Sequence, residues 1–276
     1  MNMEPIKETL KRAREDRQVA ALRETRSFSG PLAVEVSGEQ ERAEGIVYSK
    51  TRKIKVADAV LTRNRIIVND PGHEATTAYK VLRTQVLQRM AEHEWTTLAV
   101  TSPHSAEGTT LTAINLALSM AKEVNHTVLL VDLNLRSPSV HRYFDYTPEF
   151  GLRDYLLDNV SLDRILVNPE IARFVFLPGR DSITGASELL SSPRMVGLVD
   201  EMKSRYAKRI IIFDVPPVLE GDETIMFAPY IDAALLVVCE GKTRHKDLNK
   251  AMGLIGTVPI LGTVLNRSPE GARKKK

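Results

Sequence analysis

Three polar segments, each directly after an apolar run, hold the residues best suited to chemistry. The first is a loop of small and polar residues, 102–110, which precedes an apolar helical pattern. The other two are single carboxylates, Asp132 and Asp214, each at the end of an apolar run. In an open parallel sheet the carboxyl ends of the strands meet at one edge, where ligands bind. We therefore expect the loop and both carboxylates to lie around one site.

The loop has the features of a phosphate-binding loop except at two positions. Such a loop needs small residues, so that consecutive backbone N–H groups point at phosphate oxygens, and a helix N-terminus behind them. Gly108 and Thr110 match the last glycine and the hydroxyl residue of the pattern G-x-x-x-x-G-K-S/T. Pro103 stands at its first glycine and Thr109 at its lysine. The loop alone therefore does not match the phosphate-binding pattern. An Asp at the end of a strand, as at Asp132 and Asp214, is nevertheless typical of metal or water binding beside such a loop.

Alternating strand and helix patterns position these segments. Apolar strands are expected at Thr97–Thr101, Thr127–Asp132, Arg173–Leu177, Arg209–Asp214, Ala233–Cys239 and Ile260–Leu265. Helical patterns are expected at 74–92, 110–124, 187–205, 222–229 and 243–256. Continuous apolar strands are typical of burial on both faces, so the alternation predicts a doubly wound, mostly parallel α/β sheet.

The first quarter of the chain has a different texture. Residues 1–26 have the pattern of a polar helix with a thin apolar face. Residues 27–73 are expected to form a linker with short extended pieces, such as the run 65–68. The main domain is then expected over 74–268, followed by a basic tail, 269–276.

Composition excludes several classes of protein. The 276 residues are 43% hydrophobic and 26% charged, which is typical of a globular chain. One cysteine, Cys239, excludes an intramolecular disulfide framework and a Cys-rich zinc site. No run reaches the ~18 apolar residues of a membrane span, and the charged N-terminus differs from a signal peptide. The net charge of +3 is too small to indicate nucleic acid, and the cytoplasm is the expected location.

Taken in order, the blocks from 74 to 268 resemble the kinase domain of bacterial tyrosine autokinases. These are P-loop ATPases of the deviant Walker type that accompany capsule and exopolysaccharide synthesis. The matching blocks are Glu107-Gly108-Thr109-Thr110-Leu111, Asp132-Leu133-Asn134-Leu135-Arg136, Ser187–Met195, Asp214-Val215-Pro216-Pro217 and Gly262–Asn266. The texture around Asn64-Arg65-Ile66 further resembles the branch found beside exosortase-type polysaccharide clusters.

The resemblance implies ATP and Mg²⁺ as cofactors and gives roles to particular residues. Those expected to bind the nucleotide are Ala106, Glu107, Gly108, Thr109 and Thr110 at the phosphates and Asn266 at the adenine. Those expected at the metal are Thr110, Asp132 and Asp214. The expected catalytic residues are Asp132, Asp214 and Arg136.

Departures from the family pattern point to weakened or lost phosphoryl transfer. Thr109 replaces the lysine that bridges the β- and γ-phosphates, and losing one such contact costs about 10²–10³ in rate. Asn134 replaces the second Asp of D-x-D-x-R, and Ala106 adds a Cβ where glycine is usual. Candidates for a compensating cation are Arg136, Arg180 and Lys242. The sequence does not choose among them, although surface charges are the simpler expectation for the last two.

Two regulatory features of the family are absent from the sequence. The C-terminal tail has no tyrosine cluster, which leaves Tyr48 as a weak candidate acceptor outside the main domain. In the family's ring-forming pattern E-x-x-R-x-x-R, Arg83 matches the last arginine, but Lys80 replaces the first and Thr77 replaces the glutamate. Glu74 lies one turn earlier and is a candidate substitute for that glutamate. Assembly into a homo-oligomer is therefore an open question.

Three functions follow from these observations. The first is a nucleotide-binding regulator of exopolysaccharide synthesis, held at the inner membrane by a transmembrane chain-length protein. The second is an active tyrosine autokinase, and the third is a partitioning-type ATPase switch. Thr109 and Asn134 favour the first over the second, and the blocks Ser187–Met195 and Gly262–Asn266 favour both over the third.

Overall fold

The structure is a computed structural model that describes residues 51–67, 72–204, 209–256 and 258–268. The predicted helix over 1–26, the linker up to residue 50 with Tyr48, and the tail 269–276 lie outside the described residues. Within the described part, no helix combines the length and the apolar character needed to cross a membrane.

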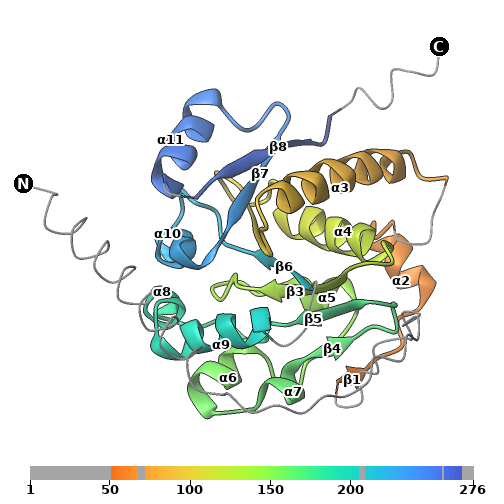
Figure 1. The fold of residues 1–276 in the computed structure, drawn as a ribbon, viewed down its shortest axis with the longest axis vertical. Helices are drawn as coiled ribbons and strands as arrows, with labels where there is room; N and C mark the ends of the chain where they lie inside the picture. The colour runs from red at the N-terminus through yellow and green to blue at the C-terminus, as the bar shows by residue number, and fades with distance from the viewer. Residues whose placement is uncertain (1–50, 68–71, 205–208, 257, 269–276) are drawn as a thin grey trace, which may run out of the picture. The chain divides into compact units, whose positions relative to one another are not determined.

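The described strands form one eight-stranded sheet in the order β1-β4-β5-β3-β6-β2-β7-β8 (Figure 1). Their bounds are β1 Arg52–Lys53, β2 Thr97–Thr101, β3 Thr127–Asp132, β4 Val167–Asn168, β5 Phe174–Leu177, β6 Arg209–Asp214, β7 Ala233–Cys239 and β8 Ile260–Asn266. Every neighbouring pair is parallel except β4 and β5. The predicted α/β sheet is confirmed, with β3 and β6 at its centre.

Helices cover both faces of the sheet (Figure 1). One face carries α2 Asp58–Arg63, α3 Glu74–Glu92, α4 Thr109–Ala121 and α5 Val140–Tyr143. The other face carries α6 Leu152–Asp158, α7 Leu162–Ile165, α8 Ala186–Leu190, α9 Pro193–Ser204, α10 Glu223–Phe227, the 3-10 turn Ala228–Tyr230 and α11 His245–Ile255. Each face therefore buries its own apolar cluster, as the continuous apolar strands require.

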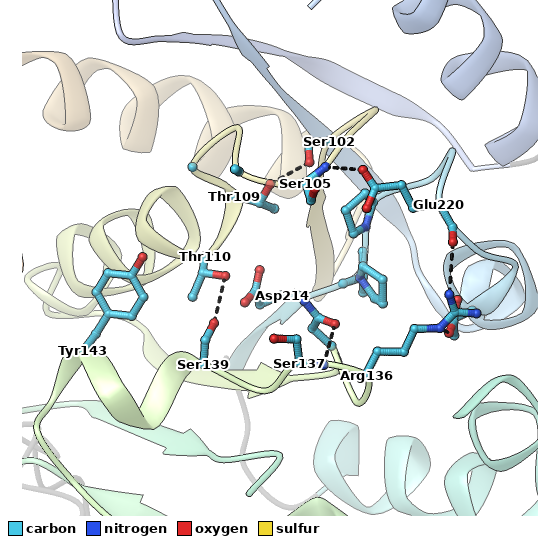
Figure 2. A pocket seen from close by; sticks show the side chains of 17 residues that line it. Ser102, Ser105, Thr109, Thr110, Arg136, Ser137, Ser139, Tyr143, Asp214 and Glu220 are labelled. Carbon is cyan, nitrogen blue, oxygen red and sulfur yellow. Dashed lines mark hydrogen bonds and ion pairs between the residues drawn. The ribbon is translucent and has the colours of Figure 1, made fainter. Parts of the chain in front are cut away.

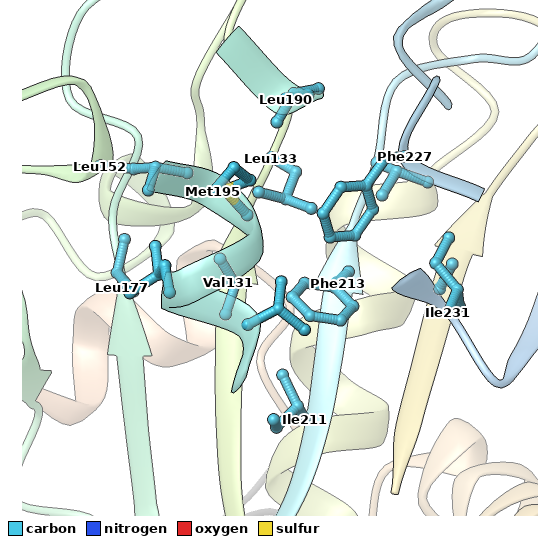
Figure 3. Close-up of a cluster of buried hydrophobic side chains, with 14 of the residues drawn as sticks. Val131, Leu133, Leu152, Leu177, Leu190, Met195, Ile211, Phe213, Phe227 and Ile231 are labelled. Carbon is cyan, nitrogen blue, oxygen red and sulfur yellow. The ribbon is translucent and has the colours of Figure 1, made fainter. Parts of the chain in front are cut away.

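The second of these clusters lies beneath the loops that leave β3 and β6 (Figure 3). Val131 and Leu133 from the β3 side lie beside Phe213 of β6, and all three side chains are fully buried or nearly so. The rings of Phe213 and Phe227 meet edge to face with their centroids 4.9 Å apart. Such a pair adds about 0.5–1.5 kcal/mol beyond burial. The packing fixes the strand ends from which Asp132 and Asp214 project.

The differences from the predicted elements have physical causes. The helical pattern 187–205 is two helices, α8 and α9, because proline at 193 disfavours helical backbone in the residue before it. The run 65–67 is not a strand; Ile66 and Ile67 are buried there without a partner strand. The short helices α2, α5, α6 and α7 were not predicted, since about one or two turns show too little periodicity.

Candidate functional site

A cavity of about 360 Å³ opens at the carboxyl edge of the sheet (Figure 2). The segments after the adjacent strands β3, β6 and β2 surround it. Its lining from the β2–α4 side is Ser102, Ser105, Ala106, Gly108, Thr109 and Thr110. Its lining from the other two sides is Asn134, Arg136, Ser137, Ser139, Tyr143, Asp214–Pro217, Glu220 and Glu223. The structure thus brings the loop and Asp214 together as expected.

The backbone of the loop turns sharply just before α4. Gly108 is the N-cap of α4 and has φ +92°, while Ala106 has φ +58°. A Cβ added to Gly108 would overlap the side-chain amide of Asn266. Glycine is therefore required at 108 for both its φ and its space. Ala106 adopts a left-handed backbone that costs an L-residue about 1–2 kcal/mol.

Thr109 points its hydroxyl back into the loop. Its Oγ1 donates to Ser102 Oγ at 2.8 Å, and Ser102 Oγ donates to the carbonyl oxygen of His104 at 2.7 Å. A hydroxyl has one proton to donate, and here that proton closes the loop on itself. Thr109 therefore supplies neither a positive charge nor a free donor to the cavity.

Glu107 supports the loop from behind. Its side chain is fully buried; Oε1 accepts from Thr243 Oγ1 at 2.5 Å and Oε2 accepts from the backbone N–H of His104 at 3.3 Å. Its carbonyl oxygen accepts from Asn266 Nδ2 at 2.8 Å. Glu107 is not among the described residues that line the cavity. The structure therefore gives Glu107 and Asn266 contacts that shape the loop.

Asp132 and Asp214 lie opposite each other on the paired strands β3 and β6. The fully buried Asp132 carboxylate accepts from the backbone N–H groups of Ser139 at 2.8 Å, Val140 at 3.0 Å and Asn134 at 3.3 Å. Burial raises its pKa to about 6. Asp132 does not appear in the described lining of the cavity, and its carboxylate holds the segment after β3 in place.

Asp214 faces the cavity and is the better placed of the two carboxylates. Its side chain is almost fully buried, and its Oδ2 has no hydrogen-bond partner among the described residues. Burial, and then the charge of Asp132, raise its pKa well above the usual range, while a hydrogen bond with Thr110 lowers it. Thr110 Oγ1 lies 3.4 Å from Ser139 Oγ on the same side of the cavity (Figure 2). A free buried carboxylate oxygen beside two hydroxyls suits a hydrated Mg²⁺.

Arg136 is the one basic residue in the described lining of this cavity. Its Nη1 donates to the carbonyl oxygen of Glu220 at 3.0 Å, and its Nε forms an ion pair with the buried Glu223 (Figure 2). Arg136 therefore ties the segment after β3 to the segment after β6. The charge of Arg136 is therefore matched by Glu223 before any ligand binds.

The other two candidate cations lie elsewhere. Arg180 pairs with Asp154 and Asp181, and the hydrogen bond that it donates to Asp154 raises its pKa. Lys242 was expected to be a plain surface charge, but its Nζ donates to the carbonyl oxygen of Ser105 at 2.7 Å. Lys242 therefore holds the outer side of the phosphate loop.

Glu220 is one of the site residues that sequence reasoning missed. Its Oε1 accepts from the backbone N–H of Ser105 at 2.6 Å and lies 3.8 Å from His104 Nδ1 (Figure 2). A phosphate oxygen would use the same N–H, so this carboxylate occupies part of the loop's anion-binding capacity. No motif marks it, since it lies six residues after Asp214 in an irregular segment.

A second cavity of about 280 Å³ adjoins the first and shares Gly108 and Tyr143 with it. Its full lining is Arg63, Asn64, Arg65, Gly108, Leu111, Tyr143, Asn266 and Arg267. Tyr143 stands at the junction, where burial and the charge of Asp214 raise the pKa of its hydroxyl. Asn266, predicted to contact adenine, thus lines a cavity next to the loop.

Together these features define a class of protein. A loop with a required glycine, a helix N-terminus behind it and a strand-end carboxylate facing the same cavity are the parts of a P-loop nucleotide-binding domain. The sheet and its helices have the P-loop NTPase fold.

Comparison with known proteins shows what the chain is similar to. A scan against models of protein families finds no match. The tyrosine-protein kinase YwqD of Bacillus subtilis is 29% identical over 208 residues, which are 75% of this chain and 86% of YwqD. The kinase domain of the Escherichia coli tyrosine kinase ETK is 26% identical with a TM-score of 0.68, covering 80% of this chain and 88% of that one. The chain is therefore a homologue of bacterial tyrosine-protein kinases and has their kinase-domain fold.

Some relatives are much longer than this chain. The putative tyrosine-protein kinase EpsB of Ralstonia solanacearum is 34% identical over 210 residues, but these are 73% of this chain and 26% of EpsB. The similarity to EpsB therefore covers about a quarter of that protein.

Proposed function

We propose that this chain is a nucleotide-binding regulator of capsule or exopolysaccharide synthesis in which phosphoryl transfer is weakened or lost. Its homology to tyrosine kinases supports the general class. One relative, from Klebsiella pneumoniae, is a putative tyrosine-protein kinase in a cps region, at 26% identity over 212 residues. The exosortase-associated branch remains a proposal from the texture around Asn64-Arg65-Ile66.

The observation that carries the proposal is that an uncharged residue, Thr109, stands where the family has a lysine. Phosphoryl transfer is mostly positioning and charge stabilisation, because the protein does little covalent chemistry. Thr109 brings no charge, and its hydroxyl proton is used by Ser102. Arg136 is matched by Glu223. The described lining of the first cavity therefore has no unmatched cation with which to stabilise a transferring phosphoryl group.

The residues that remain fit ATP and Mg²⁺ as ligands. Bound Mg²⁺ would supply charge neutralisation for the phosphates. Asp214, through its unpartnered Oδ2, and the Thr110 hydroxyl would hold the hydrated ion. The loop N–H groups from Ala106 to Thr110 would bind phosphate oxygens. Asp132 would contribute by fixing the segment after β3.

An active autokinase remains the second candidate, because Asp214 and Thr110 keep the arrangement that a metal site needs. The partitioning-type switch has less support. Apo McdA, a structural neighbour, is 21% identical with a TM-score of 0.51, a likeness that shows the fold alone.

The proposed partner is a transmembrane chain-length protein whose cytoplasmic tails bind this chain and hold it at the inner membrane. The resemblance to capsule-associated kinases supports this. Co-purification of the full chain with a membrane fraction that contains the partner tests it. We expect recovery with the partner and loss when its cytoplasmic tails are deleted; equal recovery in both cases would contradict the proposed attachment.

Two measurements on the purified chain test the function: ATP affinity with Mg²⁺, and phosphotyrosine formation. We expect binding but little phosphorylation in the natural chain. The paired substitution Thr109→Lys with Asn134→Asp should raise phosphorylation by about 10²–10³, since it restores the charges that transfer needs.

The control for this test is the same pair combined with Asp214→Asn, which should remove the gain. Strong phosphorylation by the natural chain, abolished by Asp214→Asn alone, would show an active autokinase and overturn the proposal.

A further inference from the structure

The second cavity gathers positive charge. Three arginines line it: Arg63, Arg65 and Arg267. Its described lining contains no Asp or Glu. The first cavity, by contrast, is lined by one arginine and three carboxylates. An anionic ligand that reaches the phosphate loop therefore finds its attraction on the side of the second cavity.

Two of the three arginines are available to a ligand. Arg63 lies 3.7 Å from the Asp145 carboxylate, with both side chains largely exposed. Arg65 and Arg267 form no ion pair with any carboxylate in the described part of the chain. Both are exposed, and they come from different segments, one from the turn after α2 and one from the end of β8.

The turn that carries Arg65 is firmly attached to the helix behind the loop. The buried side chain of Asn115, from α4, donates to the carbonyl oxygen of Arg65 at 3.0 Å and accepts from the N–H of Ile67 at 3.0 Å. Asn64 Nδ2 donates to the carbonyl oxygen of Tyr143 at 2.8 Å. The buried side chains of Ile66 and Ile67 hold the same turn against the domain.

The backbone around Arg65 and Arg267 is also unusual. Both have positive φ, +58° and +59°. Arginine has no intrinsic preference for this region, and each such residue costs about 1–2 kcal/mol. The hydrogen bond from Asn115 to the carbonyl oxygen of Arg65 maintains the backbone conformation there. The backbone N–H of Arg267 donates to Asn266 Oδ1 at 2.8 Å, which maintains the conformation at Arg267.

We propose that the second cavity is an anion subsite, in which Arg65 and Arg267 bind a phosphate group of a nucleoside polyphosphate held by the loop. The inference rests on the proposed nucleotide binding and deepens it. In this arrangement Arg65 and Arg267, which lie outside the P-loop motifs, supply the positive charge that Thr109 does not. Arginine suits this role because its planar group binds phosphate oxygens through paired N–H donors.

The test compares three probes by calorimetric titration: ADP, adenosine and inorganic tripolyphosphate. We expect Arg65→Gln and Arg267→Gln each to weaken ADP binding about tenfold, as lost charge-assisted hydrogen bonds do. Tripolyphosphate should weaken similarly, and adenosine should change little. Arg65→Lys keeps the charge but loses the paired donors, so it should restore only part of the ADP affinity that Arg65→Gln loses. The affinity of the natural chain should fall with added salt.

Arg52→Gln is the matched control. Arg52 is a partly exposed arginine that pairs with Glu149 at 2.8 Å and belongs to neither cavity. Its variant should bind ADP like the natural chain. Melting temperatures of all variants show whether each one is folded.

The outcomes separate the subsite from the function. Unchanged ADP binding in the folded Arg65→Gln and Arg267→Gln variants overturns the subsite, as does an equal loss for adenosine and ADP. Binding of tripolyphosphate that needs both arginines, without binding of ADP, supports the subsite and contradicts nucleotide binding. Absence of binding by all three probes contradicts both.

Discussion

The two adjoining cavities have opposite charge, although they share Gly108 and Tyr143. The first has Asp214, Glu220 and Glu223 against Arg136, and the second has arginines alone as its charged lining. A lysine in the loop would bring positive charge into the first cavity. With Thr109 there, the chain separates the charges: the first cavity suits a cation and the second an anion.

The largest expected effect tests the cation side. Asp214→Asn removes the carboxylate oxygen that faces the first cavity, so Mg²⁺-dependent ADP affinity should fall by about 100-fold. Titration with and without Mg²⁺ measures the change. Magnesium-free binding should be unaffected or slightly stronger, and an equal loss without Mg²⁺ would show that Asp214 does not act through the ion.

The next effect concerns Gly108, one of the two residues common to both cavities. Gly108→Ala places a side chain on a left-handed backbone and against the Asn266 amide. The free energy of unfolding should fall by about 1–2 kcal/mol from the backbone alone. Chemical denaturation measures it. Gly253→Ala in α11 is the control, since a Cβ there meets no neighbour within 4 Å and alanine is the better helix former.

A smaller effect on ADP affinity is expected from Glu220, a carboxylate that lines the first cavity. Glu220→Gln removes a negative charge that now occupies the Ser105 N–H. ADP affinity should increase by about tenfold, because the loop loses a repulsive charge and the neutral amide oxygen competes less well than a carboxylate for the Ser105 N–H. Glu149→Gln is a distant control, and weaker ADP binding by the Glu220 variant would contradict this role.

The smallest effect is a pH dependence that originates beneath the first cavity. Burial raises the pKa of Asp132 from 3.8 to about 6, and burial together with the charge of Asp132 raises the pKa of Asp214 well above its usual range. The folded state therefore keeps protons that the unfolded chain loses, so this stabilisation is complete below pH 3.8 and is lost as pH rises through about 6. Asp214→Asn should melt higher than the natural chain at pH 8, with a smaller difference at pH 5. A constant difference would contradict the raised pKa.

Sequence patterns predicted the sheet well and the site in part. The strands Thr97–Thr101, Thr127–Asp132, Arg209–Asp214 and Ala233–Cys239 have the predicted bounds, because continuous apolar runs between turns leave little choice. The loop and Asp214 meet because parallel strands place their carboxyl ends together. These features depend on local pattern and on a general rule of topology.

The remainder of the site depends on contacts between distant residues. Asp132 was expected at the metal, but its carboxylate is used by three backbone N–H groups. Whether a carboxylate faces a cavity or its own loop is decided by the path of the chain after it, which a motif does not contain. Glu220 contacts the loop from 115 residues away, and Arg65 lines the cavity beside the loop from a segment about 40 residues before it. No spacing rule predicts such approaches.

The side chain of Asn115 connects two parts of the chain that differ in sequence character. It belongs to the helix behind the loop and bonds to the backbone of the turn at 65–67. If a ligand draws Arg65 toward the cavity, the same ligand stabilises the docking of that turn, and docking strengthens the ligand by an equal factor, since such linkage is reciprocal. A pull applied through the segment that precedes α3 would therefore weaken the ligand's hold. The amide of Asn115 would therefore couple binding in the second cavity to the docking of this turn.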